Sequence, residues 1–92
     1  MMNDDTISAE EHNEIFRSLR QLMRQNEGKM NKAELAQLLI GAAIVNGFDR
    51  GKRITGALAT LGMNKQYAGI ILRRLTGHAW QQHEDGRYTL IG

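Results

Sequence analysis

The sequence predicts one mainly α-helical domain that ends in a β-hairpin. Apolar residues recur at helical spacing over most of the 92-residue chain, proline is absent, and the apolar pattern changes to a strand period only near the C-terminus. A chain of this length has room for a single hydrophobic core. We therefore expect a disordered N-terminus over residues 1–7 and one domain over residues 8–92.

The first predicted helix covers residues 8–27. Ser8 is followed three residues later by Glu11, which is the spacing of a capping box. The apolar side chains form a single stripe, and Gly28 ends the helix. The members of that stripe are Ile15, Phe16, Leu19, Leu22 and Met23. A helix of this kind buries one face and leaves the other in solvent.

A second helix is expected over residues 31–46. It begins at Asn31, with Glu34 again three positions further on, and ends at Asn46-Gly47. Its apolar residues cover more than one side of the helix. They are Leu35, Leu38, Leu39, Ile40, Ala42, Ala43, Ile44 and Val45. Such a helix packs against several neighbours, so we expect it at the centre of the domain.

Two shorter helices follow a polar connector over residues 48–54, in which residues 52–54 are predicted to be extended. Thr55 is expected to cap a helix that runs to Leu61. Gly62-Met63-Asn64 is a predicted turn, and Asn64 caps the next helix, which Gly77 ends. The apolar stripe of that last helix is Ala68, Ile71, Leu72 and Leu75.

Residues 79–82 and 87–91 form the predicted hairpin. A two-residue Asp85-Gly86 loop places Trp80 on the opposite face from Tyr88 and Leu90. A three-residue loop over residues 84–86, with Gly86 left-handed, pairs Trp80 with Leu90 and Gln82 with Tyr88. We prefer the second register because it brings the large apolar side chains together. Trp80, Tyr88 and Leu90 are then expected to cover the core rather than to stack on bases.

Charge is distributed unevenly along the chain. The formal net charge is +2, yet residues 1–49 carry five Lys/Arg against eight Asp/Glu, whereas residues 50–92 carry seven against two. No acidic residue lies between Asp49 and Glu84. The second half of the chain therefore presents a positive surface that attracts phosphate groups.

The order of the elements and residues 54–75 together resemble the winged helix-turn-helix DNA-binding domains of bacterial and phage proteins. Gly62 matches the glycine that opens the turn. The small or apolar positions of that pattern are filled by Ala57, Leu61, Met63, Ala68 and Ile71. Residues 80–90 are similar to the wing. The resemblance covers residues 31–92, so helix 8–27 is an addition to it. A rival alignment uses residues 32–36 but requires a long insertion before Asn64.

The resemblance implies that the helix after the turn enters the major groove of double-stranded DNA. The face opposite its apolar stripe carries Lys65, Gln66, Gly69, Ile70 and Arg73. The candidate DNA-binding residues are Arg50, Lys52, Arg53, Asn64, Lys65, Gln66, Ile70, Arg73, Arg74, His83 and Arg87. Gln66 suits adenine, while Lys65 and Arg73 suit guanine or phosphate. The side chain of Asn64 is expected to cap the helix rather than to read a base. Gly69 is explained either by close approach to DNA or by tight helix packing.

From this resemblance we expect a cytoplasmic transcription regulator of a prokaryote, phage or plasmid. It is expected to act as a homodimer through helix 8–27 or helix 31–46. The alternative is a protein–protein interaction module in a replication, segregation or other DNA-processing assembly. Glu84 and Asp85 support that alternative, because acidic groups at the wing tip repel phosphate and suit a protein partner.

Enzymatic activity, cofactors and metals are not expected. Cysteine is absent, and the sequence around His12, His78 and His83 does not supply the further ligands that a metal site needs. The glycines around residues 47–52 do not have the spacing of a phosphate-binding loop. The longest apolar stretch, residues 33–45, is shorter than a membrane span, so no membrane contact is expected.

Overall fold

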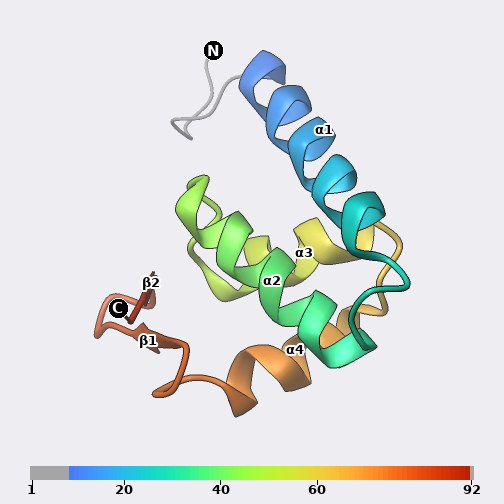
Figure 1. Cartoon of the computed structure of the whole chain (residues 1–92). Helices are drawn as coiled ribbons and strands as arrows, with labels where there is room; N and C mark the ends of the chain where they lie inside the picture. The colour runs from blue at the N-terminus through green and yellow to red at the C-terminus, as the bar shows by residue number, and fades with distance from the viewer. Residues whose placement is uncertain (1–8, 92) are drawn as a thin grey trace.

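The computed structural model describes residues 9–91, with side chains from residue 13 onward, and this part of the chain contains four helices and one antiparallel hairpin. In chain order these elements are α1 (Ala9–Asn26), α2 (Lys32–Val45), α3 (Gly51–Thr60), α4 (Lys65–Arg74), β1 (Trp80–Gln82) and β2 (Tyr88–Leu90). Figure 1 shows α2 in the middle, with α1 across its upper side, α4 below it and the hairpin beside it. The predicted mainly helical fold with a C-terminal hairpin is confirmed.

α1 occupies residues 9–26, against a predicted range of 8–27. Leu19 is fully buried, and the other four members of the predicted stripe pack half-buried against the core. The ring of Phe16 lies 5.5 Å from the ring of Phe48, with the two planes tilted by 51°. The predicted disorder of residues 1–7 and the capping box on Ser8 and Glu11 fall outside the part of the chain whose side chains are described.

α2 is the central helix, as its pattern predicts. The capping box is complete, because Asn31 Oδ1 accepts from the Glu34 N–H at 2.8 Å and Glu34 Oε1 accepts from the Asn31 N–H at 3.0 Å. The buried residues of α2 are Ala36, Leu39, Ile40, Ala43 and Ile44. They let α2 contact α1, α3, α4 and β2 at once. Val45, at the end of the helix, is 70% exposed.

α3 begins at Gly51, so the predicted extended piece over residues 52–54 and the predicted cap at Thr55 are wrong. The physical reason is burial: Ile54 belongs to the same inward stripe as Ala57 and Leu58, and the helix reaches back to include it. Thr55 lies inside the helix, where its hydroxyl donates to the Gly51 carbonyl at 3.1 Å.

The extended residue is instead Arg50, which precedes α3. Arg50 forms an antiparallel bridge with Arg87, and the Tyr88 N–H donates to the Asp49 carbonyl at 2.7 Å. The end of the α2–α3 connection therefore pairs with the start of β2, on the edge opposite β1. This pairing ties the hairpin to the start of α3.

A tight turn joins α3 to α4. Gly62 has a φ of +99°, a left-handed conformation that glycine adopts without strain, and the Met63 N–H donates back to the Leu58 carbonyl at 3.0 Å. Asn64 caps α4 as predicted, since its side-chain oxygen accepts from the Tyr67 N–H at 2.9 Å. The predicted stripe of α4 faces inward: Ala68, Ile71 and Leu72 are buried and Leu75 is half-buried.

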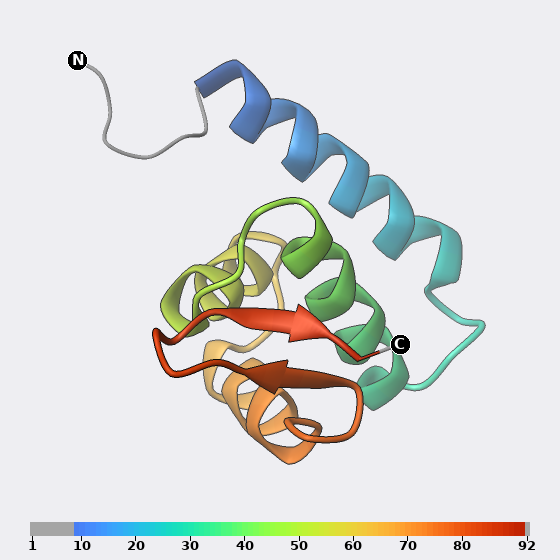
Figure 2. The same cartoon turned by 90° about the vertical axis from the view of Figure 1, so that its left-hand side faces the viewer.

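The hairpin has the preferred register, with Trp80 opposite Leu90 and Gln82 opposite Tyr88. Gly86 is left-handed, with a φ of +91°. Trp80 and Tyr88 are 1% and 6% exposed, so the prediction that they cover the core is confirmed. Leu90 is 45% exposed, so for this residue the prediction is wrong: it lies beyond the core, beside Gly41 of α2. Figure 2 shows the hairpin in front of the helices, with its tip beside α3.

Trp80 fastens the hairpin to α4. Its indole Nε1–H donates to the Leu72 carbonyl at 2.9 Å, at the end of α4 where backbone carbonyls lack helical partners. The ring belongs to the main core cluster. A single side chain thus supplies both apolar burial and a hydrogen bond to a helix end.

We expect Trp80→Ala to lower the free energy of unfolding by about 3–5 kcal/mol, because it opens a cavity and removes one of the two hydrogen bonds that the Leu72 carbonyl accepts, the other coming from the Thr76 hydroxyl. Urea unfolding followed by circular dichroism measures the change. Trp80→Phe keeps most of the buried ring and is expected to cost less. A wild-type unfolding midpoint in Trp80→Ala would show that the ring contributes nothing to the core.

Candidate nucleic-acid interface

The outer face of α4 carries the residues predicted to read DNA. Lys65, Gln66 and Arg73 are exposed, and Ile70 is 45% exposed despite its apolar side chain. Arg74 is also exposed at the end of the helix. Because the inward stripe of α4 is buried in the core, this face cannot be turned toward the protein interior. α4 therefore presents cations, an amide and one apolar side chain to solvent.

The start of α3 is a second basic element. Arg50 and Lys52 are exposed, and Arg50, the N-cap residue, makes no side-chain capping hydrogen bond. The N-terminus of a helix carries a partial positive charge and N–H groups directed outward. Cationic side chains and the helix dipole act in the same direction here, which favours a phosphate group.

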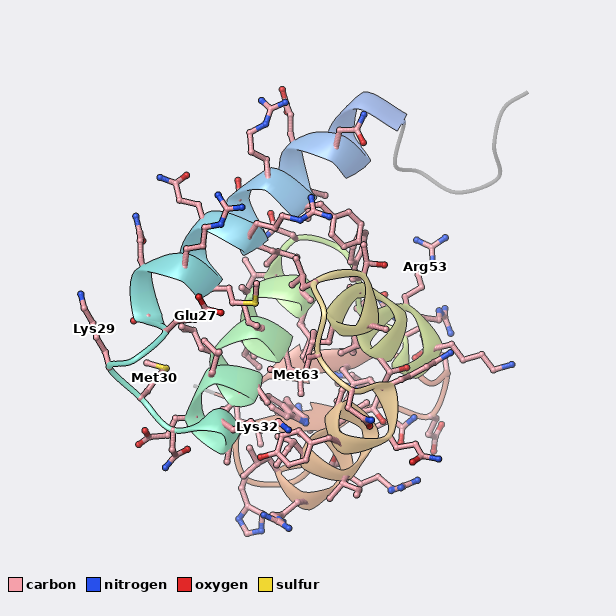
Figure 3. All side chains as sticks on the ribbon, turned by 90° about the vertical axis from the view of Figure 1, so that its right-hand side faces the viewer. Glu27, Lys29, Met30, Lys32, Arg53 and Met63 are labelled. Atoms are coloured by element: carbon pink, nitrogen blue, oxygen red, sulfur yellow. The ribbon has the colours of Figure 1, made fainter. Side chains whose placement is uncertain are left out.

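Arg53 differs from its two basic neighbours in position. It is half-buried and lines the cleft between α1 and α3, together with Phe16 and Gly56. Figure 3 shows Arg53 at one edge of the view and Lys29, in the α1–α2 loop, at the opposite edge. Arg53 therefore lies in the cleft toward α1.

The tip of the hairpin is clamped to the start of α3. Arg50 Nη1 donates to the Asp85 carbonyl at 2.6 Å, across the bridge between Arg50 and Arg87. Arg87 holds the Asp85 carboxylate through its backbone N–H at 3.1 Å and its Nε–H at 2.8 Å. These hydrogen bonds hold the pKa of the Asp85 carboxyl below its usual value of 3.8. The positive charge of Arg87 is thus largely offset within the tip.

The remaining predicted residues have local partners. His83 Nε2 lies 2.8 Å from Thr89 Oγ1 across the hairpin, although the ring stays exposed. The Asn64 side chain is engaged as the cap of α4. Thr55 of α3 lies next to Gly69 of α4, and Arg50 at the start of α3 is hydrogen-bonded to the wing tip. The start of α3 is therefore close both to the wing tip and to the outer face of α4.

Lys32 is a cation that sequence reasoning missed. Its Nζ lies 4.7 Å from the centre of the Tyr67 ring, where it makes a cation–π contact between the start of α2 and the first turn of α4. No periodicity links these two positions, because they are far apart in the chain. The contact orients Tyr67 next to Asn64 and Gln66 without placing the lysine on the outer face.

An apolar groove of about 600 Å³ lies between α2 and the hairpin. Its apolar lining consists of Leu38, Gly41, Ala42, Val45, Ala79, Trp80, Leu90 and Ile91. Val45, Leu90 and Ile91 are the most exposed of these side chains. Exposed apolar side chains gathered in one groove mark a surface suited to a protein partner.

The chain matches no protein-family model, and no curated protein or solved structure shows significant similarity to it. In residues 9–91, no group of three or more His, Cys, Asp or Glu side chains is placed to hold a metal ion. None of the helices described has the length and apolarity that crossing a bilayer requires.

The environment of Gly69 bears on the two explanations given for it. A Cβ at this position would lie 3.9 Å from Thr55 Cγ2, an ordinary contact distance. Packing between α3 and α4 therefore does not demand glycine. The absence of a side chain leaves the surface of α4 flat between Gln66 and Arg73.

We expect Gly69→Ala to raise the free energy of unfolding by about 0.5–1 kcal/mol, because alanine loses less backbone entropy in a helix and has room here. Gly56→Ala in α3, where a Cβ meets nothing within 4 Å, is the matched control and is expected to show a similar gain. Thermal unfolding measures both. A lower melting temperature in Gly69→Ala alone would restore the packing explanation.

Proposed function

We propose that this protein is a winged helix-turn-helix protein that binds double-stranded DNA. In this assignment α2, α3 and α4 form the three-helix core, the turn at Gly62 joins the two helices of the motif, and the hairpin is the wing. The observation that carries the proposal is the exposed face of α4 with Lys65, Gln66 and Arg73, adjacent to the basic start of α3. The bridge between Arg50 and Arg87 supports it, since it fixes the wing beside both helices.

In the proposed complex α4 lies in the major groove. Gln66, in the first turn of the helix, pairs with adenine, and Lys65 and Arg73 contact guanine or phosphate. Lys52 and the N-terminus of α3 hold the backbone beside the groove. The exposed Ile70 side chain suits a thymine methyl group. Contacts of both kinds are needed, because phosphate contacts position the protein and base contacts select the sequence.

The wing contributes less positive charge than its sequence indicates. Arg87 is paired with Asp85, and Glu84 is exposed beside them. Because Arg50 holds the wing in a fixed position, we expect the wing to act mainly by placing its edge, including His83, along the DNA backbone. The exposed acidic residues also favour the second candidate function, an interaction module in a DNA-processing assembly, in which the tip meets a basic protein surface.

We propose further that the protein acts as a homodimer through α2 rather than α1. The apolar side chains of α1 from residue 15 to residue 23 pack against the core, which leaves a polar outer face. The groove between α2 and the hairpin instead exposes Val45, Leu90 and Ile91, with Gly41 allowing close approach. A two-fold dimer matches palindromic DNA sites, which suits a cytoplasmic transcription regulator of a prokaryote, phage or plasmid.

Binding to random duplex DNA, followed by fluorescence anisotropy, tests the proposed function. We expect weak binding at 50 mM salt that falls steeply toward 200 mM, because each phosphate contact releases counterions. Lys65→Ala combined with Arg73→Ala is expected to lower the slope of log affinity against log salt by about 2, roughly one per phosphate contact. Lys29→Ala, which removes an exposed cation from the α1–α2 loop, is the control and is expected to leave the slope unchanged. No binding at 50 mM salt, or no effect of the double substitution, would refute the proposal.

We expect Val45→Glu to convert the dimer into a monomer, because it places an unpaired carboxylate in the apolar contact. Light scattering gives the mass in solution. Gln25→Glu, on the polar outer face of α1, introduces the same charge away from the groove and is expected to leave the dimer intact. A Val45→Glu variant that remains dimeric would exclude this groove as the contact.

A further inference from the structure

Three arginines on α1 form a basic stripe outside the helix-turn-helix. Arg17, Arg20 and Arg24 are all exposed, and with Asn13 and Gln21 they line a shallow polar groove of about 550 Å³. At about 100° per residue, the three arginines fall within a sector of about 60° on the helix. They span about 10 Å along its axis. We call these three residues the α1 stripe.

The α1 stripe lacks acidic partners within the part of the chain whose side chains are described. The ion pair found there joins Arg87 to Asp85, and no hydrogen bond or ion pair involves the three guanidinium groups of the stripe. Glu14 precedes Arg17 by three residues, so the two side chains are neighbours on the helix surface, yet they form no ion pair with each other. Like charges three and four residues apart repel one another on a helix. Arg24 complements the helix dipole in the last turn of α1, whereas Arg17 and Arg20 form no ion pair among the described side chains that would explain them.

The α1 stripe adjoins, through Arg20, the side of α1 that faces α3. Arg20 follows Phe16 by one helical turn, and Phe16 packs against Phe48 and lines the cleft to α3 with Gly56 and Thr60. Figure 3 shows all four helices from one side, with α1 above the others and α2 between α1 and α4. The stripe thus adds a set of cations next to the cleft between α1 and α3, in which Arg53 lies.

We propose that the α1 stripe binds the phosphate backbone of the same DNA duplex, beyond the segment that α4 contacts. This inference rests on the proposed function and adds a second backbone contact to it. Charge complementarity identifies the occupant: a row of unpaired guanidinium groups fits a row of phosphates, which arginine contacts bidentately. The length of the stripe, about 10 Å, corresponds to the axial rise of about three nucleotides of one strand, at 3.4 Å per nucleotide along the helix axis.

The stripe also compensates for the modest charge of the wing. Arg87 is offset by Asp85 and contributes little to the attraction of DNA. Arg17, Arg20 and Arg24 are exposed and form no ion pair among the described side chains. A duplex seated on α4 and on the α1 stripe therefore meets two separated sets of cations, with α3 between them.

The test substitutes the whole stripe, as Arg17→Gln, Arg20→Gln and Arg24→Gln, and measures anisotropy with a duplex of about three helical turns at several salt concentrations. We expect affinity at 50 mM salt to fall about tenfold or more and the salt slope to fall by about 2–3, since three phosphate contacts are lost. The melting temperature is expected to stay close to that of the wild type, because the three side chains are exposed and form no ion pair among the described side chains. The triple Arg→Lys variant keeps the charge and is expected to retain the salt slope with a smaller loss of affinity.

The outcomes separate this inference from the proposed function. Unchanged affinity in the triple Gln variant, together with a loss in the Lys65→Ala, Arg73→Ala variant, would overturn the role of the α1 stripe and leave the proposed function standing. Weaker binding with an unchanged salt slope would also overturn it, because the effect would not come from phosphates. If polyglutamate displaced labelled duplex DNA as well as unlabelled duplex does at equal charge, the stripe would bind acidic chains in general, and the inference of a DNA-backbone site would be overturned. No binding by the wild type at 50 mM salt would remove the proposed function and the inference together.

Discussion

The burial of α2 on several sides is the constraint on which the rest of the structure depends. Ala36, Leu39, Ile40, Ala43 and Ile44 are shielded by α1, α3, α4 and β2, so each of these elements is positioned by its contact with one helix. Small residues at two of the five positions allow close approach of the neighbours. The orientation of α4 follows: its apolar stripe turns toward α2, and its cations turn to solvent. The candidate DNA-binding surface is therefore a consequence of core packing.

The connection between hairpin and helices has two separate parts. Trp80 joins β1 to the end of α4 through its buried ring and its hydrogen bond to Leu72, while Arg50 joins the tip to the start of α3. The first link is apolar and shielded, and the second is polar and exposed. Exposed pairs contribute little to stability, so the core link holds the hairpin in place and the tip link sets its direction. Under the proposed function, this arrangement gives a rigid wing in which the positive charge of Arg87 is partly offset by its ion pair with Asp85.

The sequence predicted those features whose signals are local. The caps at Asn31 and Asn64 and the left-handed Gly86 were all found where expected, because each depends on residues within one turn of chain. The start of α3 was missed, since no capping side chain marks it and the burial of Ile54 decides it instead. The exposure of Leu90 was missed for a related reason: strand alternation gives the face of a residue but not how far the core extends beneath it. For the candidate site, the exposed face of α4 was predictable from its stripe, whereas the clamp between Arg50 and the wing tip was not.

By itself the sequence determined the number and order of the helices, the register of the hairpin and the concentration of basic residues after Asp49. These are properties of periodicity, turn chemistry and composition, which act over a few residues or over the whole chain. The tertiary structure alone decided which cations are exposed together. It set Arg53 toward the cleft with α1, paired Arg87 with Asp85, and left Arg17, Arg20 and Arg24 exposed without an ion pair among the side chains described. The reason is that charges act through space: their partners are chosen by the packing of distant segments, and no local pattern records that choice.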